Sequence, residues 1–169
     1  WDTVTFPALD GTMLHIPIKT VKKVDDGICV EVVKFSGDDP DITKDVSVFT
    51  TIRHIEGEVK FLAGKGIGIV TKKGLQVPVG EPSINPGPRK LIRQVIKDMT
   101  GVDGGLSVES SIPAGIALAK QTLNPVLGVE GGLSVIGTTG VLRPMSEEGF
   151  KNSLVPQIDV AREAGYDTL

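Results

Sequence analysis

Apolar and polar residues alternate along much of residues 1–62, with the two-residue period of strands buried on one face. Leu14, Ile16 and Ile18, for example, alternate with His15 and Pro17. Gly, Asp and Pro, which tight turns use, separate such runs. The pattern predicts strands over residues 1–6, 14–18, 28–34, 46–55 and 58–62.

After residue 85 the apolar residues recur with the period of a helix, and a helix is predicted over residues 86–99. Its predicted apolar face consists of Leu91, Ile92, Val95, Ile96 and Met99. Asn85 suits the capping position, Pro86 the first turn and Gly101 the position after the last turn.

Short strands and helices alternate in the rest of the chain. Strands are predicted at 106–110 and 133–136, and helices at 113–123 and 146–164. Pro156 lies inside the last predicted helix and should kink it. The apolar side of that helix is formed by Phe150, Leu154, Ile158, Val160 and Ala161.

The predicted fold class is α+β or α/β: a β-rich N-terminal part followed by a strand–helix–strand–helix order typical of a parallel α/β layer. We expect a β-rich domain over residues 1–112, with one helix at about 86–99, and part of an α/β domain over 113–169. Residues 1–6 and 166–169 both look like strands at the ends of the chain. These features predict an incomplete fragment of a two-domain protein, truncated in its C-terminal domain.

Residues 64–89 contain a Gly or Pro every few positions, and unstructured loops of this length are uncommon and usually functional. Four basic residues stand against one Glu, which gives the run a net charge of +3 in a chain of net charge −3. Successive N–H groups near Gly66 and Gly68 can form a concave anion site, or the glycines only let two strands cross. The strand-like residues after Gly68 exclude a Walker or Rossmann loop.

Composition narrows the classes of partner. The acidic balance and the 4% aromatic content of the 169 residues argue against nucleic acid as the main partner. No apolar run approaches the about 20 residues that cross a membrane, and no signal-peptide pattern is visible. The single cysteine, Cys29, fits a reducing cytoplasm. His15 and His54 are isolated in the sequence, so no metal site is predicted.

Two further turns carry candidate chemistry. The turn at 137–140 follows a predicted strand and offers hydroxyl and N–H groups to a carboxylate, ribose or phosphate, unless it is an ordinary turn. The acidic turn at 36–41 can bind a metal, hold a cationic sulfonium or supply a base. Its alternative interpretation is a solvated turn that begins at Asp-Pro.

Several long stretches resemble the CbiD family of cobalamin biosynthesis, among them SGDDPDIT at 36–43 and GIGIVTKKGLQVPVGEPSINPGPR at 66–89. Residues 111–148 and 154–169 carry the same resemblance, which covers nearly all of the chain from Ser36 onward. The resemblance implies a cobalt-precorrin-5B C-1 methyltransferase of the anaerobic, early-cobalt route. It implies S-adenosylmethionine as the methyl donor and cobalt only as part of the substrate.

The implied substrate is a corrinoid with acetate and propionate arms, and such a polycarboxylate suits the positive run at 64–89. The residues assigned to substrate binding are Lys65, Gly66, Gly68, Lys72, Lys73 and Arg89, of which Arg89 would form a bidentate fork. The methyl donor is assigned to Gly137, Thr138, Thr139, Gly140 and Asn124. Asp38 and Asp39 are the catalytic candidates, to neutralise the sulfonium or deprotonate the macrocycle. The alternative function is a non-catalytic tetrapyrrole- or anion-binding module, and homo-oligomer formation stays open.

Overall fold

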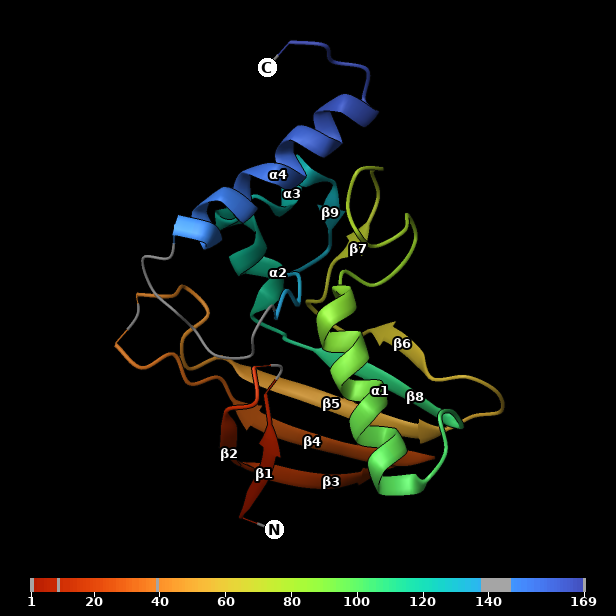
Figure 1. Ribbon diagram of the computed structural model, residues 1–169. Helices are drawn as coiled ribbons and strands as arrows, with labels where there is room; N and C mark the ends of the chain where they lie inside the picture. Colours follow the sequence, from red (N-terminus) through yellow and green to blue (C-terminus); the bar gives the residue numbers. More distant parts are fainter. Residues whose placement is uncertain (1, 9, 39, 138–146, 169) are drawn as a thin grey trace.

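A five-stranded sheet with one long helix across its face forms the centre of the fold (Figure 1). The structure, a computed structural model, describes residues 2–8, 10–38, 40–137 and 147–168. Within this described part, no helix combines the length and the apolar character needed to cross a bilayer.

The strands of the sheet follow the order β3-β4-β5-β8-β6. They are β3 (Thr20–Val24), β4 (Gly27–Val33), β5 (Ser47–His54), β8 (Leu106–Ser111) and β6 (Lys60–Ala63). Only the pairing of β6 with β8 is parallel among these strands. The strands predicted in the corresponding runs are confirmed, whereas the pattern does not predict β3, because Lys22 and Lys23 interrupt its apolar alternation.

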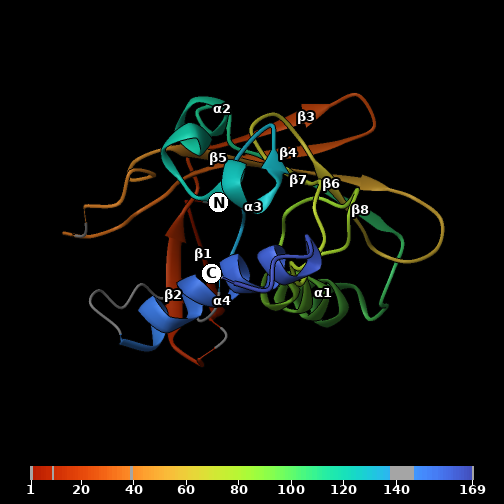
Figure 2. The ribbon, with the colours of Figure 1, turned by 90° about the horizontal axis from the view of Figure 1, so that it is seen from above.

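Strands β1 (Thr3–Pro7) and β2 (Met13–Pro17) form a separate antiparallel hairpin, which confirms the first two predicted strands. His15 Nδ1 lies 2.9 Å from Thr5 Oγ1 across this hairpin, so His15 is a strand-surface residue. Figures 1 and 2 place the hairpin on the same face of the sheet as the long helix.

The main hydrophobic core lies between helix α1 (Pro86–Thr100) and the sheet. Its buried members are Val59, Phe61, Ile67, Ile84, Ile96, Val108, Ile112, Ala119 and Leu133. The helix boundaries are confirmed, and Gly101 ends the helix with φ at 75°. Two details of the helix prediction are wrong. The Asn85 side chain makes no capping hydrogen bond. Met99 is 82% exposed, because the buried stripe ends one turn before the helix does.

The segment after β8 departs most from the prediction. Instead of one helix over 113–123, the chain forms α2 (Gly115–Leu118), a short 3-10 turn η1 (Ala119–Gln121) and α3 (Asn124–Leu127). The short strand β9 (Val129–Glu130) then pairs antiparallel with β7 (Ile69–Val70).

The predicted strand at 133–136 is also wrong: Leu133 and Val135 make only isolated parallel bridges, with Ile67 and Ile84. Residues 133–136 form no strand beside β8, so the predicted parallel α/β layer is wrong for the described residues, and the fold class is α+β. Core residues come from both sides of position 112. The division into domains at that position stays a prediction.

Helix α4 (Glu147–Glu163) confirms the last predicted helix and lies against α3 (Figure 1). Val160 on its predicted apolar side is buried. Phe150, Leu154 and Ile158, however, are exposed, so most of that side faces solvent in this chain. The kink at Pro156 stays a prediction.

Candidate functional site

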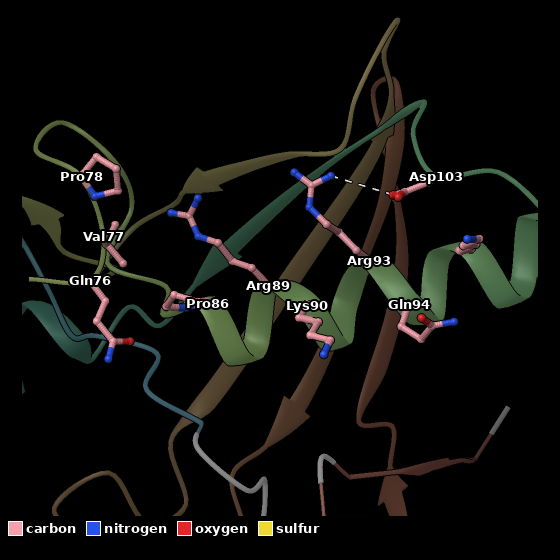
Figure 3. A pocket seen from close by; sticks show the side chains of 10 residues that line it. Gln76, Val77, Pro78, Pro86, Arg89, Lys90, Arg93, Gln94 and Asp103 are labelled. Carbon is pink, nitrogen blue, oxygen red and sulfur yellow. Dashed lines mark ion pairs between the residues drawn. The ribbon is translucent and has the colours of Figure 1, made fainter. Parts of the chain in front are cut away.

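A hollow of about 510 Å³ runs along α1, between the helix and the loop that contains residues 76–78 (Figure 3). We call it the α1 hollow. Its lining residues are Gln76, Val77, Pro78, Pro86, Arg89, Lys90, Arg93, Gln94, Lys97 and Asp103. Four of them are basic and one is acidic, so the hollow is positive on a chain whose net charge is −3.

Helix geometry explains why the basic side chains gather here. Arg89, Arg93 and Lys97 follow one another at four-residue spacing and therefore share one face of α1. Figure 3 shows Arg89 and Arg93 directed to one side of the helix, and Lys90 and Gln94 to the other. Lys90 and Lys97 are seven residues apart, which is about 10 Å along a helix axis.

Arg89 is braced within the chain. Its Nε donates to the Ile84 carbonyl oxygen at 2.7 Å, its Nη2 to the Pro82 carbonyl oxygen at 2.9 Å, and its Nη1 to Glu81 Oε2 at 3.1 Å. The guanidinium also lies 5.2 Å from the ring centre of Phe61. Glu81 already accepts a hydrogen bond from Nη1 in this structure. The bidentate interaction of Arg89 with a substrate carboxylate therefore stays a prediction.

Arg93 is anchored in a similar way but less completely. Its Nη2 donates to the Val59 carbonyl oxygen at 3.1 Å, and its guanidinium lies 5.5 Å from the Phe61 ring centre. Its Nη1 is 3.9 Å from Asp103 Oδ1. Phe61 is buried, so the aromatic ring under both guanidinium groups belongs to the core.

Lys90 and Lys97 are both exposed, and within the described residues neither ammonium group has a hydrogen-bond or ion-pair partner. The α1 hollow therefore combines two braced guanidinium groups with two unpaired ammonium groups. Such a set suits a ligand that carries several carboxylates or phosphates.

The glycines of the 64–68 run pack against other backbone segments. Gly68 N donates to the Leu133 carbonyl oxygen at 2.9 Å, and Leu133 N donates to the Gly66 carbonyl oxygen at 2.9 Å. A Cβ at Gly66 would lie 1.8 Å from the Ile112 carbonyl oxygen, and one at Gly132 would lie 2.1 Å from the Gly66 carbonyl oxygen. These contacts favour the interpretation that the glycines let segments cross. Their role in substrate binding stays a prediction.

The three lysines of the same run lie outside the α1 hollow. Lys65, Lys72 and Lys73 are exposed, and none of them lines it. Lys72 Nζ donates to the Val126 carbonyl oxygen at 3.2 Å. The structure therefore brings only Arg89, of the basic residues assigned to the substrate, to this hollow.

The acidic turn lies in the loop between β4 and β5. Asp38 is exposed there, and Asp39 lies outside the described residues. Asp41 forms an ion pair with Lys34. Partial burial alone would raise the pKa of Asp41, but hydrogen bonds from Lys34 and Thr43 outweigh it and lower the pKa to about 2.

Acid is therefore expected to weaken the fold through Asp41. The pKa of this carboxyl falls from 3.8 to about 2, so its contribution is complete above about pH 4 and is lost as the pH falls toward 2. Solvent screens the pair because the Lys34 side chain is 36% exposed, and we expect a loss of about 1 kcal/mol. Urea unfolding at several pH values should show this decrease in the wild type and a smaller one in Asp41→Asn. An equal decrease in both would contradict it.

The residues assigned to the methyl donor are only partly described. Asn124 is buried, its Nδ2 donates to the Gly132 carbonyl oxygen at 2.9 Å, and its Oδ1 accepts from Ser134 Oγ at 3.2 Å. Its amide therefore holds the 124–134 turn together. Gly137 has φ at 43° and lies beside Pro88, whereas Thr138, Thr139 and Gly140 lie outside the described residues. Across the described part of the chain, no group of three or more His, Cys, Asp or Glu side chains is arranged to hold a metal.

Comparison with known proteins places this α+β chain in a family. The CbiD family model matches residues 1–144. The chain belongs to the CbiD family. It is 48% identical to the cobalt-precorrin-5B C(1)-methyltransferase of Moorella thermoacetica, over 99% of this chain and 45% of that protein. It is also 48% identical to the protein of the same name from Methanocaldococcus jannaschii, over 95% of this chain and 45% of that protein.

A solved structure has a similar fold. It is the cobalamin biosynthesis protein (cbiD) from Archaeoglobus fulgidus, with a TM-score of 0.64 over 92% of this chain and 50% of that chain. At 24% identity, this likeness concerns the fold alone. The CbiD chain described here spans about half the length of the curated relatives it matches.

Sequence reasoning about this CbiD chain missed three basic residues of the α1 hollow: Lys90, Arg93 and Lys97. The signal was present, because basic residues at positions 89, 93 and 97 recur at helical spacing along one edge of the apolar stripe. The prediction assigned substrate binding to the lysines of the Gly- and Pro-rich run instead.

Proposed function

We propose that this chain takes part in S-adenosylmethionine-dependent methyl transfer to C-1 of cobalt-precorrin-5B, giving cobalt-precorrin-6A in cobalamin biosynthesis. Curated relatives at up to 48% identity carry the name of this C(1)-methyltransferase. The observation on the chain itself that carries the proposal is the α1 hollow. It gathers four basic side chains on an acidic protein, which suits the carboxylate arms of a precorrin.

The α1 hollow acts in this proposal by binding and orienting the macrocycle. Lys90 and Lys97 attract carboxylate arms about two helical turns apart, while braced Arg93 offers a fixed guanidinium. A methyl transfer from a sulfonium needs no proton for its leaving sulfur, so positioning supplies much of the rate. Cobalt arrives inside the substrate.

The methyl donor is proposed to bind near the turn at 137–140, with Asp38 and Asp39 as the acidic residues that face its sulfonium or accept a proton from the macrocycle. Thr and Gly at such a turn suit the ribose and carboxylate of the donor. Asn124 contributes by holding the neighbouring turn through its amide. The single cysteine, Cys29, is consistent with work in the reducing cytoplasm.

Methyl transfer tests this proposal directly. The protein is incubated with cobalt-precorrin-5B and S-adenosylmethionine that carries a labelled methyl group, and label in the macrocycle is measured. We expect incorporation that depends on the protein and decreases about 5- to 30-fold in Lys90→Gln/Lys97→Gln. The double variant Lys22→Gln/Lys23→Gln, which changes the same charge on β3, is the matched control.

The alternative function, a non-catalytic tetrapyrrole-binding module, has a distinct outcome in this experiment. It is the better description if the macrocycle binds with the same dependence on Lys90 and Lys97 but acquires no label. Its supporting observation is the α1 hollow itself, because four basic side chains account for binding a polycarboxylate without any chemical step. If the labelled methyl group is incorporated equally well without these lysines, the substrate site lies outside the α1 hollow.

A further inference from the structure

We infer that Asp103 occupies, in the free protein, the position of a ligand carboxylate at Arg93, and that a polycarboxylate ligand displaces it. This inference rests on the proposed function of the α1 hollow as a carboxylate site. Asp103 is the acidic residue among those that line the hollow, and its Oδ1 lies 3.9 Å from Arg93 Nη1. Figure 3 shows Asp103 reaching Arg93 from the loop after α1.

The contact between Asp103 and Arg93 is weak enough to be exchanged. The Asp103 side chain is 56% exposed and the Arg93 side chain 37% exposed. Exposed ion pairs contribute little to stability, because water solvates both charges and the side chains lose freedom when they pair. A ligand whose other carboxylates contact Lys90 or Lys97 therefore competes with Asp103 effectively.

Arg93 keeps its position when Asp103 leaves. Its Nη2 donates to the Val59 carbonyl oxygen, and its guanidinium lies over the buried Phe61 ring. Neither contact involves Asp103. Exchange at Nη1 therefore replaces one carboxylate by another at a guanidinium that is already oriented.

Arg89 is not expected to exchange its carboxylate in the same way. Its three nitrogens all donate within the chain, and its side chain is 22% exposed. Glu81, which accepts from its Nη1, does not line the hollow. The two arginines thus differ: Arg89 fixes the start of α1, and Arg93 is the site of exchange.

Charge-matched variants test this exchange. Uroporphyrin, a tetrapyrrole with eight carboxylates, serves as the probe, and its binding is followed by fluorescence anisotropy at fixed salt. Asp103→Asn should tighten binding about three- to fivefold, because the internal competitor is gone. Asp98→Asn removes the same charge from α1, but Asp98 accepts from Gln94 and does not line the hollow, so we expect a change below about 1.5-fold.

A second readout follows the arginine itself. In the wild type, the Nε–H resonance of Arg93 should shift on addition of uroporphyrin, and Asp103→Asn should produce part of that shift without the probe. Cyanocobalamin, whose peripheral carboxyls are amidated, is the control ligand. It should not shift the Nε–H resonance of Arg93, and its binding should not become tighter in Asp103→Asn.

The outcomes separate this inference from the proposed function. If Asp103→Asn and Asp98→Asn tighten uroporphyrin binding equally, while binding still depends on Lys90 and Lys97, the displacement of Asp103 is wrong but the carboxylate site stands. Failure of the wild type to bind uroporphyrin, or binding that ignores Lys90 and Lys97, would overturn the carboxylate site and the exchange with it.

Discussion

Replacing Gly66 by alanine is expected to lower the free energy of unfolding by about 2–5 kcal/mol, since a left-handed backbone costs about 1–2 kcal/mol and overpacking about 1–3 kcal/mol. The new Cβ would lie 1.8 Å from the Ile112 carbonyl oxygen, so one backbone segment must move. Gly66 also has φ at 81°, a conformation that alanine adopts only with strain. Urea unfolding followed by far-UV circular dichroism measures the loss.

Gly131 is the matched control for Gly66. Its φ is 84°, but nothing lies within 4 Å of the Cβ that alanine would add. Gly131→Ala should therefore cost only the backbone term of about 1–2 kcal/mol. Similar losses in the two variants would show that the close approach of Gly66 to Ile112 is unimportant for stability.

Reversing both unpaired charges of the α1 hollow, with Lys90→Glu and Lys97→Glu, is expected to weaken uroporphyrin binding about 50-fold. Each reversal replaces an attraction by a repulsion, and at about 0.5–1 kcal/mol per exposed contact the changes total about 2–4 kcal/mol. Both side chains are exposed, so the fold should tolerate the change. Fluorescence anisotropy titrations at fixed salt measure the effect.

The comparison variant for this reversal is Lys72→Glu/Lys73→Glu, which makes the same change in net charge outside the hollow. Its binding should weaken by less than about fivefold, through general electrostatics alone. If this variant loses as much affinity as the first, the anion site lies along the Gly- and Pro-rich run instead of on α1.

Strands β4, β5 and β8 and helix α1 could be predicted because each carries a local period, whereas β3, β7 and β9 were not predicted. Alternation sets β4 and β5, and the stripe that contains Ile92 and Ile96 sets α1. Met99 follows the same stripe, yet it is exposed, since a periodic pattern does not say where the opposing surface ends. Local patterns thus give elements more reliably than they give contacts.

The segment at 133–136 shows what a local pattern cannot give. Leu133 and Val135 look like a buried strand, and both are bridged to distant segments, but the partners are Ile67 and Ile84 in the irregular run. That pairing depends on backbones that approach closely at Gly66 and is not encoded in the hydrophobic period of either segment.

The candidate site was only partly predictable for a related reason. The positive charge of residues 64–89 predicts a surface that binds an anion, and Arg89 of that run does line the α1 hollow. The hydrogen bonds of Arg89 to Pro82 and Ile84, and the position of Asp103 beside Arg93, depend on the turn before α1 and the loop after it. These loop geometries could not be predicted from composition or spacing.

The bracing of Arg89 and Arg93 has a thermodynamic consequence for any ligand of the hollow. Immobilising a long side chain on binding costs about 0.5–1.5 kcal/mol of rotamer entropy. Contacts to Phe61 and to backbone carbonyls already restrict the two guanidinium groups. Only Lys90 and Lys97 still lose rotamer freedom when the ligand arrives. The hollow therefore binds with about half of the entropic penalty that four free cations would incur.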